Sequence, residues 1–518
     1  MKTLHHKKIQ MKKFKFLYVV LIAAVLGSCN KTLDPDVYSS LTNQNAFNTV
    51  SDAMAAVNAV YARLKGPAVG DNFDYWTVRH FALTDLTTDI GHCNYGGDPG
   101  QLSLAQWNSS NGLLAEDWRQ IYKLIADANN ALYNIGNMTT LTDEEKTQFF
   151  AELKFLRSIA YMDLTDAWGP VPLITENDVA TATSSSYLSQ PVPASVERVD
   201  SMMIADLQFG ADHLPVNYVN NAIYSSNDYG RATKGAALTL MAKLYLRENN
   251  WQKAADYCKL VMDMNVYSLY PSYLGLFTEE NKWCEENIFS VLSDANVNGT
   301  ELMNHFGPLN HPVVQNRWQY YAVSWDFYNS FSNNDDRKLC FYPKYTGVDG
   351  LVYAQPPTLG ATPPDGYSYM ADIATKKYAD SSSPSVALYY DGHSVDILRY
   401  ADVLLSRAEA LNNLNGPTQE CIDLINDIRR RSHATPLVLA NYNKQTLSDA
   451  ILQERGWEFF YEGKRRSDLI RFNKYDVIVN AYLTRIGQPA VIEMPKNKYF
   501  PYPQNQVTIN PNLDNTGR

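Results

Sequence analysis

Segments with the periodicity of an α-helix, repeated along most of the chain, constrain its fold more than any other feature. In residues 113–135 the apolar side chains recur at steps of three and four residues, which places them on one face of a helix. The same spacing recurs in eight further segments: 52–64, 143–168, 196–214, 231–247, 251–264, 395–414, 417–432 and 447–473. These segments predict an all-α fold in which helices pack against one another.

The lengths of the segments between these helices predict how the helices are arranged. Helix pairs recur at roughly 35–45 residues, close to the ~34 residues of tetratricopeptide-type repeats. Two irregular segments, 66–112 and 266–395, interrupt the repeats and are rich in aromatic residues. Loops this long are usually functional or disordered, and their aromatic content argues against disorder. We therefore expect a tetratricopeptide-like helical repeat scaffold with long irregular aromatic-rich loops on one face.

The N-terminal segment has the parts of a secretory leader. Residues 1–28 hold six lysines between Lys2 and Lys15 and no acidic residue. The apolar run 16–26 has about half the length of a membrane-spanning helix, which needs ~20 residues, so it indicates a secretory signal rather than a transmembrane anchor. The four residues Leu-Gly-Ser-Cys that end at Cys29 match a lipobox, in which Cys29 becomes the lipidated first residue of the mature chain.

Several acyl chains, palmitate among them, would hold Cys29 stably at a membrane. Residues 29–45 are polar and suit a lipid-anchored tether. An ordinary signal peptide with a cysteine near its end is the alternative. Met11 is a second candidate start, because residues 11–29 alone make a complete signal.

The charge balance argues against nucleic acid as a partner. The chain has 45 basic and 55 acidic residues, and removal of the leader takes away six lysines, which leaves a net charge of −16. No cluster of Lys and Arg offers a surface that could follow a phosphate backbone. The five cysteines outside the leader are scattered and form no CxxC pair, so neither a disulfide framework nor a zinc site is expected. Cys258 and Cys421 lie in helical segments and are expected in the core.

Common catalytic and cofactor-binding motifs are absent from the sequence. HExxH, GxSxG, GxxxxGK[ST] and GxGxxG do not occur, and no cofactor or metal is expected. A glycosidase needs only two carboxylates facing each other across a cleft, which a sequence with 55 acidic residues does not exclude.

Five blocks of the mature chain, in order, resemble those of the SusD/RagB family. They are Glu152-Leu-Lys-Phe-Leu-Arg-Ser-Ile-Ala-Tyr-Met-Asp-Leu with Trp168-Gly-Pro-Val-Pro-Leu-Ile, Gly230-Arg-Ala-Thr-Lys-Gly-Ala-Ala-Leu, Leu398-Arg-Tyr-Ala-Asp-Val-Leu-Leu-Ser-Arg-Ala-Glu-Ala, Glu454-Arg with Phe460-Tyr-Glu-Gly-Lys-Arg-Arg-Ser-Asp-Leu-Ile-Arg, and Pro501-Tyr-Pro-Gln with Asn510-Pro-Asn-Leu. Ser467 departs from the pattern, since an aromatic residue often stands there.

The resemblance implies a non-enzymatic glycan-binding lipoprotein of the outer membrane, facing the cell exterior. It implies an N-terminal helical region over 46–265 and a C-terminal RagB/SusD region over 266–518 with a loop-rich insertion at 266–395. Relatives of this kind cap a SusC-like TonB-dependent transporter and hold an oligosaccharide or polysaccharide before import. A surface-anchored glycosidase, or a peptide-binding or interaction protein of the same import system, remains the alternative; the glycan, its linkage and its length are open.

Sugar rings stack their C–H faces on aromatic planes while their hydroxyls need polar partners, and two aromatic segments offer both. The resemblance places family ligand sites in the same two regions. The candidate ligand-binding residues are Asp71, Tyr75, Trp76, Arg79, Asn94, Tyr95, Trp107, Asn316, Trp318, Tyr320 and Tyr321. Trp76, Trp318 and Tyr320 are the foremost of these, although packing within the loops is the alternative for any single ring. Trp118, Trp168 and Trp457 lie on helical segments and are expected in the core.

Charged residues inside the family-like blocks are expected to pair with one another or with backbone groups, because a buried unpaired charge is costly. These residues are Arg157, Arg399, Glu409, Glu454, Arg455, Glu462, Arg466 and Asp468. The pair Asp335-Asp336 offers oxygen ligands for calcium, but a solvated turn is the favoured interpretation, because the spacing is not that of an EF-hand loop.

Overall fold

The computed structural model describes residues 47–65, 75–181, 190–224 and 228–518. Contacts divide the chain into Met1–Asn48 and Thr49–Arg518, and every element named below belongs to the second unit. The leader, the lipobox cysteine Cys29, the tether and the candidate Asp71 lie outside the described residues. Within them, no helix combines the length and the apolar character needed to cross a membrane.

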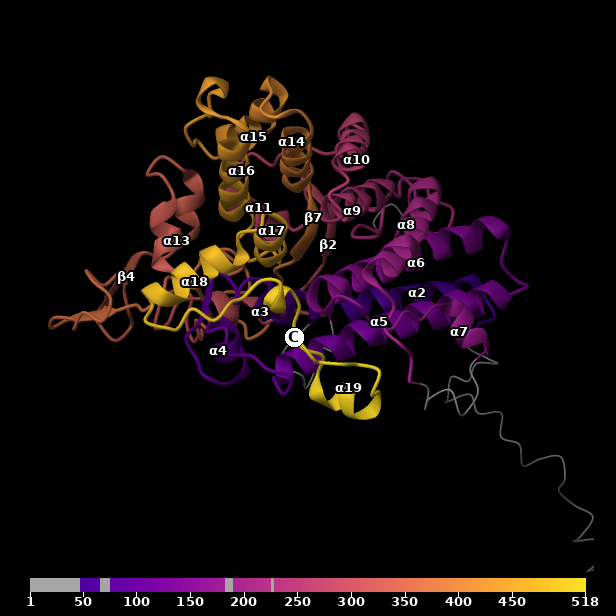
Figure 1. Cartoon of the computed structure of the whole chain (residues 1–518), viewed down its shortest axis with the longest axis horizontal. Coiled ribbons are helices and arrows are strands. Elements are labelled where there is room, and N and C mark those ends of the chain that lie inside the picture. Colours follow the sequence, from indigo (N-terminus) through magenta and orange to yellow (C-terminus); the bar gives the residue numbers. More distant parts are fainter. Residues whose placement is uncertain (1–46, 66–74, 182–189, 225–227) are drawn as a thin grey trace, which may run out of the picture. The chain divides into compact units, whose positions relative to one another are not determined.

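The N-terminal half is a series of helices that pack in the order α2, α5, α6, α8, α9 and α10, as the repeat pattern predicts, while the short α7 packs on α5 (Figure 1). They are α2 (Val50–Lys65), α5 (Gly112–Asn137), α6 (Asp143–Trp168), α7 (Glu176–Thr181), α8 (Val196–His213), α9 (Lys234–Arg247) and α10 (Trp251–Asp263). Polar side chains cap their first turns. Thr142 forms a capping box with Glu145, and Ser195 accepts a hydrogen bond from the amide of Arg198.

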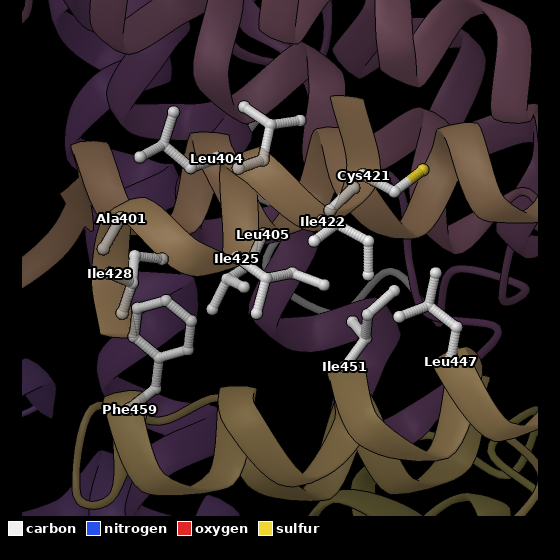
Figure 2. Close-up of a cluster of buried hydrophobic side chains, with 12 residues drawn as sticks. Ala401, Leu404, Leu405, Cys421, Ile422, Ile425, Ile428, Leu447, Ile451 and Phe459 are labelled. Carbon is white, nitrogen blue, oxygen red and sulfur yellow. The ribbon is translucent and has the colours of Figure 1, made fainter. Parts of the chain in front are cut away.

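The C-terminal half holds a second group of helices, connected to the first by contacts between α10 and α14. It contains α14 (Tyr400–Asn415), α15 (Gln419–Arg431), α16 (Lys444–Phe459), α17 (Arg465–Arg471) and α18 (Tyr475–Arg485). Figure 2 shows Leu447, Ile451 and Phe459 pointing from α16 toward the apolar faces of α14 and α15. The expected core position of Cys421 is confirmed in this cluster, and Cys258 is buried in α10.

Two expected helices differ from the structure. The segment 395–414 begins as strand β7 (Val395–Arg399), paired antiparallel with β2 (Asn287–Val291), and only then becomes α14. All five β7 residues are buried, so the segment shows neither the alternation of a half-exposed strand nor a polar helix face.

The second difference is a break in the expected helix over 447–473. Tyr461 and Gly463 adopt positive φ angles of 51° and 73°, which no α-helix accommodates. Their backbone amides donate to the carboxylate oxygens of the buried Asp85 at 3.0 Å each. The helix therefore ends at Phe459 because the following backbone binds a carboxylate from a distant segment.

The two irregular segments contain short elements rather than long loops. Residues 75–112 hold η1 (Tyr75–Arg79), α3 (His80–Thr84), β1 (Gly91–Cys93) and α4 (Gly97–Ser103). Residues 266–395 hold α11 (Tyr273–Leu276), η3 (Glu279–Asn281), α12 (Leu302–Phe306), β3 (Tyr321–Val323), α13 (Trp325–Ser330), η4 (Asp336–Cys340), β4 (Lys344–Thr346), β5 (Val352–Ala354) and β6 (Tyr367–Tyr369), together with β2. Strand β1 pairs antiparallel with β3, with Cys93 opposite Tyr321, so this ladder joins the two segments.

The charged residues of the family-like blocks are paired, as predicted. Arg399 is fully buried and contacts the carboxylates of Glu286, Glu458 and Glu462. The other contacts are Arg157 with Asp206, Glu409 with Arg471, Glu454 with Arg337, Arg455 with Asp402 and Asp468, and Arg466 with the carbonyls of Asn497 and Lys498.

The expected solvated turn is confirmed in part: Asn333 and Asn334 form an exposed turn and Asp336 is partly exposed. Asp335 differs, because it is buried and both of its carboxylate oxygens accept hydrogen bonds from the Arg337 guanidinium. In the described residues no group of three or more His, Cys, Asp or Glu side chains is arranged to hold a metal ion.

The C-terminal tail packs on the N-terminal helices, and it contains η6 (Lys496–Lys498) and α19 (Gln504–Ile509). The Phe500 amide donates to the carbonyl of Ala167, and the Trp168 indole donates to that of Pro501. Trp118 and Trp168 are in the core as expected, whereas Trp457 is only half-buried, against Phe331.

Candidate functional site

The pairing of β1 with β3 brings the two aromatic segments together at one surface. Asn94 and Tyr95 follow β1, and Trp318 and Tyr320 precede β3, so an antiparallel ladder sets them side by side. Along 316–321 the side chains alternate between the surface and the interior. Asn316, Trp318 and Tyr320 are exposed or half-buried, while the three residues between and after them are buried. The alternation has a period of two residues, although the segment is not a regular strand, because Asn316 and Gln319 adopt positive φ angles of 58° and 45°.

Five aromatic rings form an accessible surface that we call the aromatic platform, made of Tyr95, Trp318, Tyr320, Tyr389 and Tyr390. The ring of Tyr95 stacks on Tyr320 with centroids 5.0 Å apart and planes at 25°, and its hydroxyl donates to the Trp318 carbonyl at 3.0 Å. Trp318 lies edge-on to Tyr389, which in turn contacts Tyr390. Tyr95, Tyr389 and Tyr390 are 44%, 55% and 41% exposed, so part of each ring is accessible to a ligand.

Arg317, buried beneath the platform, holds two of its segments together. Its guanidinium donates to the carbonyls of Val386 and Leu388 at 2.6 and 3.0 Å. It also contacts the amide oxygen of Asn304, whose nitrogen donates to the carbonyl of Tyr389. The loop that carries Tyr389 is thus fixed to the segment that carries Trp318.

An ionic cluster anchors the same loop from the other side. The buried His393 ring lies between Asp391 and Asp380, with nitrogen–oxygen distances of 3.0 and 3.1 Å, and 3.6 Å from Glu279. Burial alone would lower the pKa of His393, but the hydrogen bonds to Asp380 and Asp391 outweigh it and raise the pKa to about 9. The ring is therefore an imidazolium at neutral pH.

A neutral histidine backs the platform. The buried ring of His305 meets Trp318 and Tyr320 edge-on at 5.0 and 5.4 Å, and burial lowers its pKa to about 4. Polar groups border the rings: Asn94 and Asn316 are exposed, and Glu301 lies beside Tyr389. Aromatic faces with amide and carboxylate neighbours suit a ligand that has both apolar C–H faces and hydroxyl groups.

Four candidate residues are buried and do not belong to this surface. Tyr75 is fully buried and donates to Asp163 at 2.6 Å, and Tyr321 is in the core against Tyr461. Trp76 is 6% exposed and stacks on His80 beside a cavity of about 90 Å³. Arg79 is buried near Glu116. The π-helix η1 turns Tyr75, Trp76 and Arg79 inward, and β3 does the same for Tyr321, which the residue types alone do not reveal.

Trp107 lies apart from the platform, half-buried with its ring edge-on to Phe500. Sequence reasoning missed Tyr389 and Tyr390. The signal for them was available, since two adjacent tyrosines stand in the second aromatic-rich segment beside Asp391.

The fold and the platform define a class: a helical repeat scaffold that presents an exposed aromatic surface from its irregular segments. Comparisons with known proteins identify the family within this class. A family model described as "SusD family" matches residues 342–516, and a model described as "Starch-binding associating with outer membrane" matches residues 36–246. The chain belongs to the SusD/RagB family, which confirms the resemblance.

Relatives match the chain over nearly its whole length. SusD-like protein P25 of Formosa agariphila is 25% identical over 96% of this chain and 97% of its own. A SusD-like carbohydrate binding protein from Bacteroides fragilis shares the fold with a TM-score of 0.75 and 22% identity, over 90% of this chain and 99% of that one. Surface glycan-binding protein A from Bacteroides thetaiotaomicron, solved in complex with laminarihexaose, has a TM-score of 0.71 and 22% identity over the same shares.

Proposed function

We propose that the protein is a cell-surface lipoprotein that binds oligosaccharides on the aromatic platform and breaks no bond in them. The observation that carries the proposal is the set of exposed rings fixed on Arg317 and the β1–β3 ladder. Stacking on fixed rings gives affinity at little cost in side-chain entropy. A chain of several sugars can contact more of the five rings than a single sugar can.

The proposal extends to the partner and the location. Lipidation of Cys29 would hold the protein at the outer membrane, facing outward, with residues 29–45 as its tether. A SusC-like TonB-dependent transporter would receive the bound oligosaccharide. Support comes from family membership and from the lipobox.

A binding screen that also detects turnover tests the proposal. Laminarin, starch and xylan, with their hexasaccharides, are titrated calorimetrically into the protein, and released sugars are assayed in the same samples. We expect one polysaccharide and its hexasaccharide to bind, with no sugar released and little affinity for the monosaccharide. Turnover would make the protein a glycosidase. Peptide binding without glycan binding would place it in peptide import.

A further inference from the structure

A second pair of accessible aromatic rings lies outside the platform. Tyr229 is 56% exposed, and its ring is nearly parallel to that of the half-buried Trp283, with centroids 6.4 Å apart and planes at 26°. Neither residue is a family-site candidate from the sequence. A large exposed ring on a folded surface indicates a binding role more strongly when space for a ligand adjoins it.

Two hollows adjoin Tyr229. One has a volume of about 430 Å³ and is also lined by Asn58 and Asn298. The other has a volume of about 670 Å³ and is also lined by Trp283, Tyr267 and Asn217. Both volumes are within the ~300–1,000 Å³ range of small-molecule sites. Like the platform, these hollows combine aromatic rings with exposed amide side chains.

The backbone beside Tyr229 is held rigidly. Gly230 has a φ of +83°, and a Cβ on it would come within 2.5 Å of the Leu292 side chain, so only glycine fits. The next residue, Arg231, is buried, donates to Glu152 and Asn58, and stacks on Tyr224. The Gly-Arg start of this family-like block thus fixes the position from which Tyr229 projects.

The charged groups that line the two hollows balance in sign. Arg231 contacts the carboxylates of Asp228 and Glu152, Lys65 lines the smaller hollow and Glu285 lines the larger one. With no excess of either sign, the hollows favour neither an anionic nor a cationic sugar. This balance fits a neutral hexose or pentose polymer, which needs only hydrogen-bonding groups and apolar faces.

The smaller hollow adjoins the platform through residues 298–300. Asn298 lines the hollow, and the next residue, Gly299, lies against Tyr390, since a Cβ on Gly299 would approach the Tyr390 Cβ to 2.7 Å. Thr300 is bridged to Asp391, its amide donating to the Asp391 carbonyl at 2.7 Å. A ligand chain leaving the platform at Tyr390 thus has a neighbouring hollow that leads to Tyr229.

We propose that the two hollows beside Tyr229 and Trp283 form a second glycan-binding subsite, which binds a neutral polysaccharide already held on the platform. This inference rests on the proposed function. Two linked contacts on one chain raise the apparent affinity through effective concentration, by roughly 10²–10⁴ in favourable geometry. A ligand that is too short to reach both sites has no such increase in affinity.

The test compares a polysaccharide with its own hexasaccharide, using the pair from laminarin, starch and xylan that binds the wild-type protein. In the double variant Tyr229→Ala/Trp283→Ala, affinity for the hexasaccharide should stay within about twofold, and affinity for the polysaccharide should fall at least tenfold. Tyr133→Ala, which removes an exposed ring from α5, is the matched control. Tyr229→Ala alone serves if the Trp283 substitution disturbs folding.

Two outcomes separate this inference from the proposed function. If the double variant binds the polysaccharide as tightly as the wild type, the second subsite is refuted and the platform stands. If the wild-type protein binds none of the three glycans, the proposed function fails and the subsite fails with it. A platform variant, Tyr95→Ala/Trp318→Ala/Tyr320→Ala, should keep weak polysaccharide binding that disappears when Tyr229→Ala is added.

Discussion

Single residues of the platform differ in role although they are neighbours in sequence. Trp318 and Tyr320 are accessible and Gln319 between them is buried, donating to the Asp372 carbonyl. Gln319 also adopts a φ of 45°, which is uncommon for a residue other than glycine. Backbone strain of this kind is concentrated at binding sites, where it fixes side chains that contact a ligand.

Substitution of Trp318 by Ala should reduce binding much more than it reduces stability, because the ring is only half-buried. Loss of the indole face removes one stacking surface, and we expect glycan affinity to fall about tenfold or more, the effect typical of a central aromatic contact. Calorimetric titration measures the affinity, and thermal denaturation should show only a small decrease of the midpoint, from the lost contacts with His305 and Tyr389. Tyr133→Ala is the control; equal losses in both variants would count against a specific role for Trp318.

The His393 cluster predicts a dependence of stability on pH. Its pKa is raised to about 9 from an ordinary value of 6.5, so the folded state binds the proton more tightly than the unfolded state. The stabilisation is fully present below about pH 6.5 and is lost as the pH rises through 9. Between pH 7 and 10 the wild-type melting temperature should fall more steeply than that of His393→Gln. Parallel profiles would show that the histidine is not charged.

At the scale of elements, the break between α16 and α17 depends on Gly463. A Cβ there would meet His80 Nε2 at 2.3 Å, and the φ of +73° disfavours any side chain. Gly463→Ala should lower the free energy of unfolding by about 2–4 kcal/mol through strain and overpacking. Gly487 has a φ of +76° with open space around it, so Gly487→Ala should cost only about 1 kcal/mol. Equal losses in urea denaturation would refute the packing argument.

The sequence pattern predicts most helices because their apolar periodicity and caps are local features. Residues 143–168 form a helix with the predicted limits, and its capping box is visible in the sequence. Strand β7 and the break at Gly463 escape prediction because they depend on partners far along the chain, β2 and Asp85. The same limit applies to the site: residue types mark both aromatic segments, but only the β1–β3 ladder and η1 decide which rings face outward.

The whole molecule, as we propose it, consists of a helical scaffold, an aromatic platform and a lipid anchor. We expect the lipid on Cys29 to be the anchor, since residues 16–26 are too short to span a bilayer. In the native host, Cys29→Ala should move the protein from the membrane fraction to the soluble fraction, and mass spectrometry should find no acylated N-terminal peptide. Retention of the variant in the membrane fraction would mean that something other than acylation of Cys29 holds the protein there.

A crystal structure of the protein with the hexasaccharide that binds it would show directly whether the aromatic platform holds the glycan. We expect sugar rings stacked on Tyr95, Trp318 or Tyr320, with hydroxyls near Asn94, Asn316 or Glu301. Sugar bound only elsewhere, for example in the cavity beside Trp76, would show that the platform is not the binding site.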